Sequence, residues 1–255
     1  MNNKINIFCL PFAGGSRYSY NGYRQYAQHI NIVPLELPGR GSRFQEPLLD
    51  NIHDMVEDLF AQIKERLSHP YAIYGHSMGA LLGFLLTRRI AEEGLREPRH
   101  LFFTGRAAPC VKKVREAIHT QPREEFFASL KALGGCPEEL LQDEALMDCF
   151  EPIIRADFQA LATYQYEPGD AFNIPITVMT GVEEDISREE ALAWQQETSA
   201  LVAVKAFVGD HFFIYGHERA IVNIMTGVML QQQQKALRRP AAETLLVEPE
   251  NEPLW

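Results

Sequence analysis

Residues 71–89 read YAIYGHSMGALLGFLLTRR and decide the fold. The first four residues are apolar or aromatic and predict a buried strand, whereas the residues from about Ser77 to Gly94 predict a helix. Between the two lies Gly75-His76-Ser77-Met78-Gly79, in which a serine stands between two glycines at a strand-to-helix corner. This pattern is typical of a nucleophile elbow, because the glycines let strand and helix approach closely while the serine Oγ stays exposed. We therefore interpret Ser77 as a nucleophile.

Strand and helix patterns alternate on both sides of this corner. Short apolar segments rich in β-branched or aromatic residues predict strands at 5–10, 32–37, 71–74, 100–104, 176–180 and 202–208. A helix pattern also covers 52–67, where apolar residues recur at spacings of three and four. Such alternation predicts an α/β protein with a mostly parallel central sheet flanked by helices. Together with the elbow it predicts an α/β-hydrolase fold.

The alternation is interrupted between about residues 112 and 170, where proline and glycine break several short helical patterns. An insertion of this kind between two strands predicts a helical lid, and its many apolar and aromatic residues must pack against something. We expect a single domain over 1–231 that contains this lid. Residues 232–255 are expected to form the end of the last helix and a loosely held tail.

Composition excludes several classes of function. Lys and Arg number 24 and Asp and Glu 34, so the formal charge of −10 argues against nonspecific nucleic-acid binding. No apolar stretch approaches the ~18 residues of a membrane span, and the apolar run near the N-terminus is too short for a signal peptide. The four cysteines form no CxxC pair, and the His and Cys residues lack metal-ligand spacing. We expect a cytoplasmic protein that holds no metal or cofactor and binds neither nucleic acid nor membrane.

A serine nucleophile needs a base, and the base needs an acid to hold it. In the predicted fold the acid and then the base follow the serine in the chain. His211 lies directly after the last predicted strand and is the expected base, whereas His217 is more typical of a surface or packing residue. The loop after the strand at 176–180 offers three carboxylates, of which Asp185 is the expected acid and Glu184 the alternative. Asp210 adjoins His211, but neighbouring side chains in an extended segment point apart.

Acyl transfer also needs two donors for the oxyanion. One is expected to be the backbone N–H of Met78, which follows the nucleophile. The other is expected from the small-residue loop at 11–16, where the N–H of Ala13 is favoured and that of Phe12 is the alternative.

Several segments together resemble one family, the type II (external, editing) thioesterases that accompany nonribosomal peptide and polyketide synthases. The matching segments are LPFAGGS at 10–16, LELPGRGSR at 35–43, YGHSMGA at 74–80, FTGRAAP at 103–109, LGGCPEELL at 133–141, IIRADFQALATYQY at 153–166 and VGDHFF at 208–213. The resemblance as a whole covers the chain from about residue 5 to residue 231. The elbow alone would indicate only the fold, whereas the combination is much more specific.

The resemblance implies a triad of Ser77, His211 and Asp185. It also implies hydrolysis of acyl groups thioesterified to the phosphopantetheine arm of acyl or peptidyl carrier domains, which clears stalled or wrongly primed chains from a synthase. The arm belongs to the partner, so no cofactor of the enzyme's own is implied. Two alternatives remain: a small-molecule carboxylesterase or acyl-CoA thioesterase of the same fold, and a catalytically silent binding protein.

Overall fold

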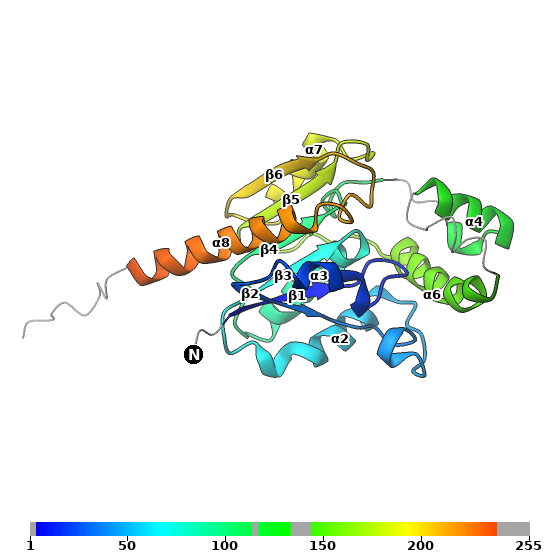
Figure 1. Cartoon of the computed structure of the whole chain (residues 1–255), viewed down its shortest axis with the longest axis horizontal. Coiled ribbons are helices and arrows are strands. Elements are labelled where there is room, and N and C mark those ends of the chain that lie inside the picture. Colours follow the sequence, from blue (N-terminus) through cyan, green and yellow to red (C-terminus); the bar gives the residue numbers. More distant parts are fainter. Residues whose placement is uncertain (1–3, 114–116, 134–143, 239–255) are drawn as a thin grey trace, which may run out of the picture.

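The computed structural model describes residues 4–113, 117–133 and 144–238. Its six strands form one parallel sheet in the order β2-β1-β3-β4-β5-β6 (Figure 1). The strands are β1 (Ile5–Leu10), β2 (Ile30–Pro34), β3 (Tyr71–His76), β4 (Leu101–Thr104), β5 (Ile176–Gly181) and β6 (Val202–Phe207). The parallel sheet and its flanking helices confirm the predicted fold class.

The second strand lies earlier in the chain than the predicted 32–37. Ile30 pairs with Ile5, and the last paired residue is Pro34 beside Cys9. Ile30 and Ile32 are buried while Asn31 is exposed, so the first half of this edge strand has one buried face. Because Asn31 is polar, a search for continuous apolar runs does not include the start of this strand. The strand ends where β1 itself is about to end.

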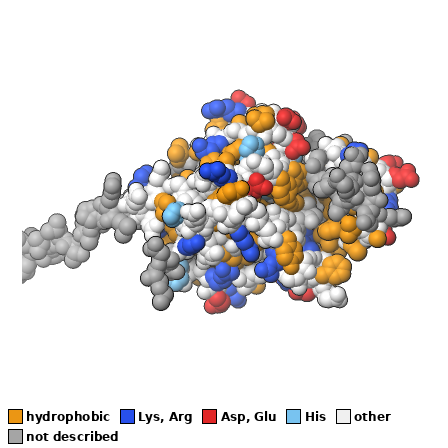
Figure 2. Space-filling view, viewed as in Figure 1, with side chains coloured by type: hydrophobic (Ala, Val, Ile, Leu, Met, Phe, Trp, Pro, Cys, Tyr) orange, Lys and Arg blue, Asp and Glu red, His pale blue; other side chains and the backbone are white. Residues whose placement is uncertain are grey.

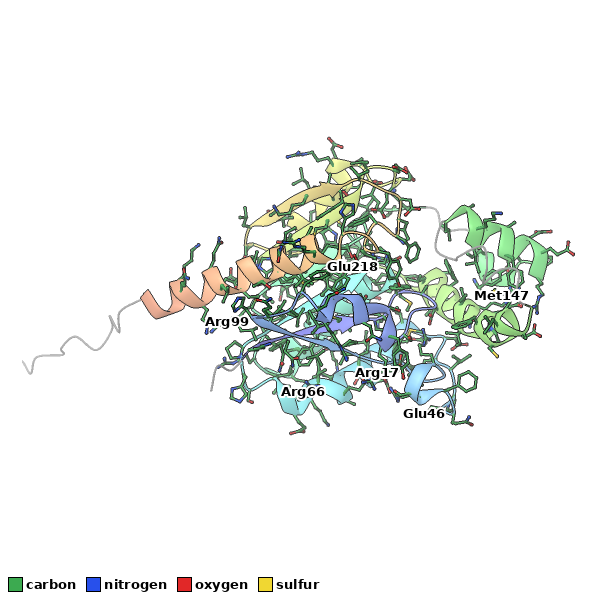
Figure 3. The ribbon with its side chains drawn as sticks, viewed as in Figure 1. Arg17, Glu46, Arg66, Arg99, Met147 and Glu218 are labelled. Carbon is green, nitrogen blue, oxygen red and sulfur yellow. The ribbon has the colours of Figure 1, made fainter. Side chains whose placement is uncertain are left out.

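Helices cover both faces of the sheet. One face packs against α2 (Ile52–Ile63), α3 (Met78–Glu92) and α7 (Arg188–Leu192), and the other against α1 (Asn21–Arg24) and α8 (Glu218–Arg238). Side chains of β1 alternate between the two layers, since Phe8 faces the first and Ile7 the second. Glu218, labelled in Figure 3, marks the start of α8. No helix in the described ranges is both long and apolar enough to cross a membrane.

Along the chain, a small helical lobe follows β4 and precedes β5, within the predicted insertion at 112–170 (Figure 1). It contains η4 (Ile118–Thr120), α4 (Arg123–Ala132) and α6 (Glu144–Thr163), which share a small apolar cluster that includes Phe126, Leu130 and Ile154. Met147, labelled in Figure 3, lies in this lobe. In the view of Figure 2, hydrophobic side chains reach the surface beside the lobe, and charged ones are spread over the rest of this face. The predicted tail beyond residue 238 lies outside the described residues.

Short 3₁₀ segments lie in the connections between the strands and helices. They are η1 (Arg17–Tyr20), η2 (Gly41–Arg43), η3 (Lys64–Arg66) and η5 (Ala193–Gln196). The first two follow β1 and β2 at the carboxyl edge of the sheet, where ligands bind in open α/β sheets.

Candidate active site

Ser77 lies at the sharp corner between β3 and α3. With φ of 52° and ψ of −113° it is the non-glycine residue with positive φ in the described part of the chain. Such a conformation is strained, and it persists only where contacts with the surrounding structure hold the backbone in place. A Cβ on Gly75 would lie 2.1 Å from the Gly79 carbonyl oxygen, and one on Gly79 would lie 2.6 Å from that of Leu10. The glycines of the predicted elbow are therefore required by backbone contact.

His211 follows β6 and pairs with a carboxylate. Its Nδ1 lies 2.5 Å from Oε1 of Glu184, whose side chain is only 3% exposed. The other oxygen of Glu184 accepts the Gly181 backbone N–H at 2.6 Å. Both carboxylate oxygens are thus occupied, and the imidazole is held from its Nδ1 side. This leaves Nε2 as the nitrogen that can take a proton.

The prediction that Asp185 holds the base is wrong, and the alternative, Glu184, occupies that place. The chain turns back directly after β5, where the Glu184 N–H donates to the Gly181 carbonyl oxygen at 3.3 Å. The turn brings the Glu184 side chain over the strand end, toward His211. Asp185 comes one residue later; its side chain is fully exposed and pairs with Lys113 at 3.4 Å. Proximity to the strand end therefore buries the Glu184 side chain and brings it to the base.

Ser77 and His211 line the same cavity of about 700 Å³. Beside them the wall is formed by Ala13, by Arg106 and by carboxylates of the loop after β5. The wall contributed by the lobe and by the chain that follows α4 is apolar and consists of Leu130, Ala132, Leu133, Phe150, Ile154, Phe158 and Leu161. The cavity therefore joins a polar reactive end to an apolar compartment, an arrangement that suits an acyl substrate.

The two predicted oxyanion donors lie at this reactive end. Met78 opens α3, and the N–H groups of a first helical turn have no partner inside their own helix. The loop after β1 makes a tight turn in which the Gly15 N–H donates to the Phe12 carbonyl oxygen at 2.8 Å, with φ of +74° at Gly14. The Ala13 N–H has no hydrogen bond to any described residue. The Phe12 side chain is buried and packs edge-on against Phe212, at 5.4 Å between ring centroids.

A buried histidine lies behind the base. The His76 ring lies 4.7 Å from that of His211 between centroids, and its Nδ1 lies 3.1 Å from Oγ1 of Thr104. Burial, and secondarily the proximity of His211, lower the pKa of His76 well below its usual value, so this ring stays neutral. Gly105 fits against both rings, since a Cβ there would lie 2.5 Å from Cε1 of His76 and 3.1 Å from Cε1 of His211. The requirement for glycine at position 105 comes from these two rings, and no local sequence pattern indicated it.

Neither of the remaining candidates is paired with the base, since each has a different hydrogen-bond partner. His217 Nε2 is 2.9 Å from the Val208 carbonyl oxygen, and its ring packs on Phe207, as expected for a packing residue. Asp210 accepts the N–H of Phe212 at 2.8 Å through its side chain. In the parts of the chain that the structure describes, no three His, Cys, Asp or Glu side chains are grouped to hold a metal ion.

Comparison with known proteins agrees with this geometry. A family model described as "Thioesterase domain" matches residues 5–227. The gramicidin S biosynthesis protein GrsT of Aneurinibacillus migulanus is 34% identical over 224 residues, which cover 87% of this chain and 88% of that protein. The structure of ClbQ from the colibactin NRPS/PKS pathway has a TM-score of 0.87 at 30% identity, covering 91% of this chain and 100% of ClbQ. That of the type II thioesterase BorB from the borrelidin biosynthetic cluster has a TM-score of 0.81 at 33% identity, covering 88% and 92%. The chain therefore belongs to the thioesterase domain family, and its relatives include type II thioesterases of biosynthetic pathways, as the resemblance implied.

Proposed function

We propose that this protein hydrolyses acyl thioesters from the phosphopantetheine arm of acyl or peptidyl carrier domains and so removes aberrant or stalled acyl groups from a synthase. The observation that carries the proposal is the cavity shared by the strained Ser77 and by the His211–Glu184 pair. Its relatives from nonribosomal peptide and polyketide pathways support carrier domains as the partner. The proposal places the reaction in the cytoplasm, where thiols such as that of the buried Cys9 stay reduced.

In this mechanism the Ser77 Oγ attacks the thioester carbonyl carbon while Nε2 of His211 takes its proton. Glu184 keeps the Nδ1 proton in place and stabilises the imidazolium that forms. The N–H groups of Ala13 and Met78 stabilise the oxyanion. Collapse of the intermediate releases the pantetheine thiolate, which takes the proton from His211. Water then gives a proton to Nε2 of His211 and attacks the acyl-enzyme carbonyl carbon. The second intermediate collapses as His211 returns this proton to the Ser77 Oγ, which releases a carboxylic acid and regenerates the enzyme.

The helical lobe has a matching role in this proposal. We propose that residues 112–170 act as a lid that shapes the acyl compartment, because α4 and α6 supply much of its apolar wall. The amide hydrogens of α6 should then exchange with solvent more slowly when an acyl-pantetheine mimic on a carrier domain is added. Exchange as slow as in β3, and unchanged by the mimic, would argue for a rigid lobe with no gating role.

A comparison of leaving groups tests the substrate class. The same acetyl group is offered on a carrier domain, on CoA and as a nitrophenyl ester, and kcat/KM is measured for each. We expect the carrier-bound thioester to be preferred over acetyl-CoA by about tenfold or more, because contacts with the carrier add binding energy. Equal rates on carrier and CoA, or a preference for the nitrophenyl ester, would favour the acyl-CoA thioesterase or carboxylesterase alternative.

A pair of serine variants tests whether the site is catalytic at all. Ser77→Ala should lower kcat by about three orders of magnitude or more without preventing folding. Ser68→Ala, in an exposed turn before β3, is the matched control and should retain full activity. Undiminished hydrolysis by folded Ser77→Ala would favour a different nucleophile, and no hydrolysis by the wild type would favour the silent binding protein.

A further inference from the structure

A buried ion pair joins the lobe to the loop after β2. Asp157 of α6 is fully buried, and Arg40 is 2% exposed. Nη1 of Arg40 donates to Oδ2 of Asp157 at 2.6 Å, and Nη2 donates to Oδ1 at 2.8 Å. Oδ2 also accepts the backbone N–H of Gly14 at 2.7 Å. Three segments that are far apart in the sequence, at 10–16, 35–43 and 153–166, therefore meet at one carboxylate.

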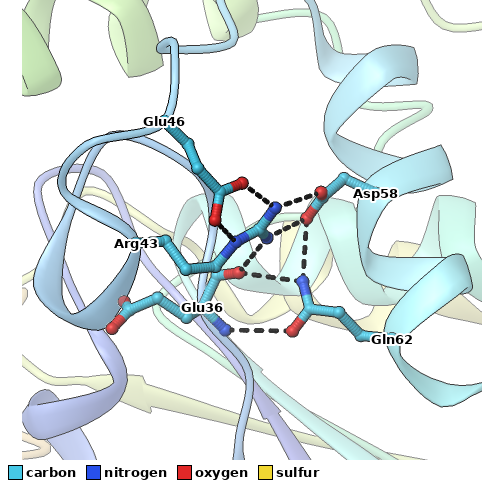
Figure 4. A network of polar contacts seen from close by, with 5 residues as sticks. All are labelled: Glu36, Arg43, Glu46, Asp58 and Gln62. Atoms are coloured by element: carbon cyan, nitrogen blue, oxygen red, sulfur yellow. Dashed lines mark hydrogen bonds and ion pairs between the residues drawn. The ribbon is translucent and has the colours of Figure 1, made fainter.

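A second polar network, drawn in Figure 4, fixes the loop that contains Arg40 to α2. Arg43 donates to both carboxylate oxygens of Asp58 on α2, at 2.6 and 2.8 Å, and to the Glu36 carbonyl oxygen at 2.9 Å. Gln62 of α2 donates to the same carbonyl oxygen at 2.8 Å. The carboxylates of Asp58 and Glu46 raise the pKa of Arg43, so its charge is permanent. The loop that presents Arg40 is thus fixed to the body of the molecule.

The turn after β1 and the Gly14 contact together hold the peptide units on both sides of Ala13. The Phe12 carbonyl and the Ala13 N–H belong to one trans peptide unit, so they point in opposite directions. Because the Phe12 carbonyl oxygen accepts the Gly15 N–H, the Ala13 N–H is turned away from that bond. The next peptide is held by the Gly14 N–H bonded to Asp157. Ile154 of α6 closes the arrangement, since its Cγ1 would lie 3.0 Å from a Cβ on Gly14.

We infer that Asp157 is a positioning residue for the oxyanion hole, and that Arg40 holds its carboxylate in place through two hydrogen bonds. Docking of α6 onto the loop after β1 thereby sets the direction of the Ala13 N–H before the substrate arrives. Stabilisation of an oxyanion depends on such preorganised donors. The inference rests on the proposed function, in which Ala13 supplies one donor. It assigns to the lobe a second role besides lining the acyl compartment.

Two variants remove the acceptor of the Gly14 N–H in different ways. Asp157→Leu removes the carboxylate and leaves the Arg40 charge buried without its counterion, which lowers stability. The double variant Arg40→Met/Asp157→Leu removes both charges and keeps the volume, so that it retains a packed core. Glu151→Gln is the matched control, because Glu151 pairs with Arg155 on the same helix and does not contact the loop. Thermal unfolding and circular dichroism establish that each variant is folded.

The readout separates transition-state binding from structure. Turnover of a nitrophenyl ester is measured with inhibition by a trifluoromethyl ketone, which forms an oxyanion adduct with Ser77, and by the matching methyl ketone. We expect both acceptor variants to lose ~10- to 100-fold in kcat, less than the ~10²–10³ for outright removal of a donor, with KM nearly unchanged. The trifluoromethyl ketone should weaken by the same factor, the methyl ketone should not, and Glu151→Gln should match the wild type.

Two results would overturn the inference: a folded double variant with wild-type kcat, or an equal weakening of both ketones. The test is independent of the carrier domain, because neither the nitrophenyl ester nor the ketones require it. A wild type without carrier preference would contradict the proposed function and leave the ketone comparison intact. A carrier preference with an unchanged ketone ratio would contradict only the role of Asp157.

Discussion

Replacing Glu184 by glutamine should disable the base while leaving the fold intact. The carboxylate accepts two hydrogen bonds, one from Nδ1–H of His211 and one from the Gly181 N–H. A glutamine has one acceptor oxygen for these two donors. If the oxygen stays on Gly181, the amide NH₂ faces Nδ1 and favours the tautomer with the proton on Nε2. That tautomer cannot accept the proton of Ser77.

The size of the effect follows from two contributions. Loss of a charge-assisted hydrogen bond to the imidazolium costs ~1.5–3 kcal/mol, or about 10- to 150-fold in rate. The tautomer change adds to this, so kcat should fall ~10²- to 10⁴-fold with KM nearly unchanged. Asp185→Asn is the matched control, because its side chain is fully exposed and contacts Lys113, and its kcat should stay within about threefold.

Steady-state kinetics on a nitrophenyl ester and on an acyl-carrier domain measure both variants, and thermal unfolding shows that they are folded. A larger loss in Asp185→Asn than in Glu184→Gln would refute the assignment of Glu184. Equal losses would mean that the loop acts as an acidic surface and that neither residue holds the base.

Three further changes have outcomes set by the structure. Gly79→Ala would place a Cβ 2.6 Å from the Leu10 carbonyl oxygen, so the urea midpoint should reveal a loss of ~1–3 kcal/mol in unfolding free energy. Gly105→Ala should lower kcat at least about tenfold and slow labelling of the active-site serine by a fluorophosphonate, because its Cβ would press on His211. Burial lowers the pKa of His100 to about 4, so below pH ~6.5 the unfolded state binds a proton that the folded state refuses. This group should therefore lower the unfolding free energy by ~1.4 kcal/mol for each pH unit between pH ~6.5 and 4. The unfolding free energy of His100→Gln, measured with urea at several pH values, should decrease less steeply with falling pH by that amount.

The sequence by itself determined the features whose cause is local. Strand, corner and helix around Ser77 follow from adjacent residues, because the flanking glycines permit a backbone contact that no Cβ would allow. The order of nucleophile, acidic loop and base along the chain, together with the family motifs, was sufficient to predict the fold and to propose His211 as the base. These signals extend over a few residues each, and they need no knowledge of what packs against them.

Only the tertiary structure decided which carboxylate meets the base and what the family motifs do. Glu184 and Asp185 are adjacent and chemically alike, and the choice depends on how the turn after β5 lies against the loop after β6. Arg40 and Asp157 are 117 residues apart, and nothing in either segment alone indicates a partner. Both outcomes depend on the relative placement of segments that are distant in the chain. That placement is set by packing across the sheet and the lobe, which local propensity does not encode.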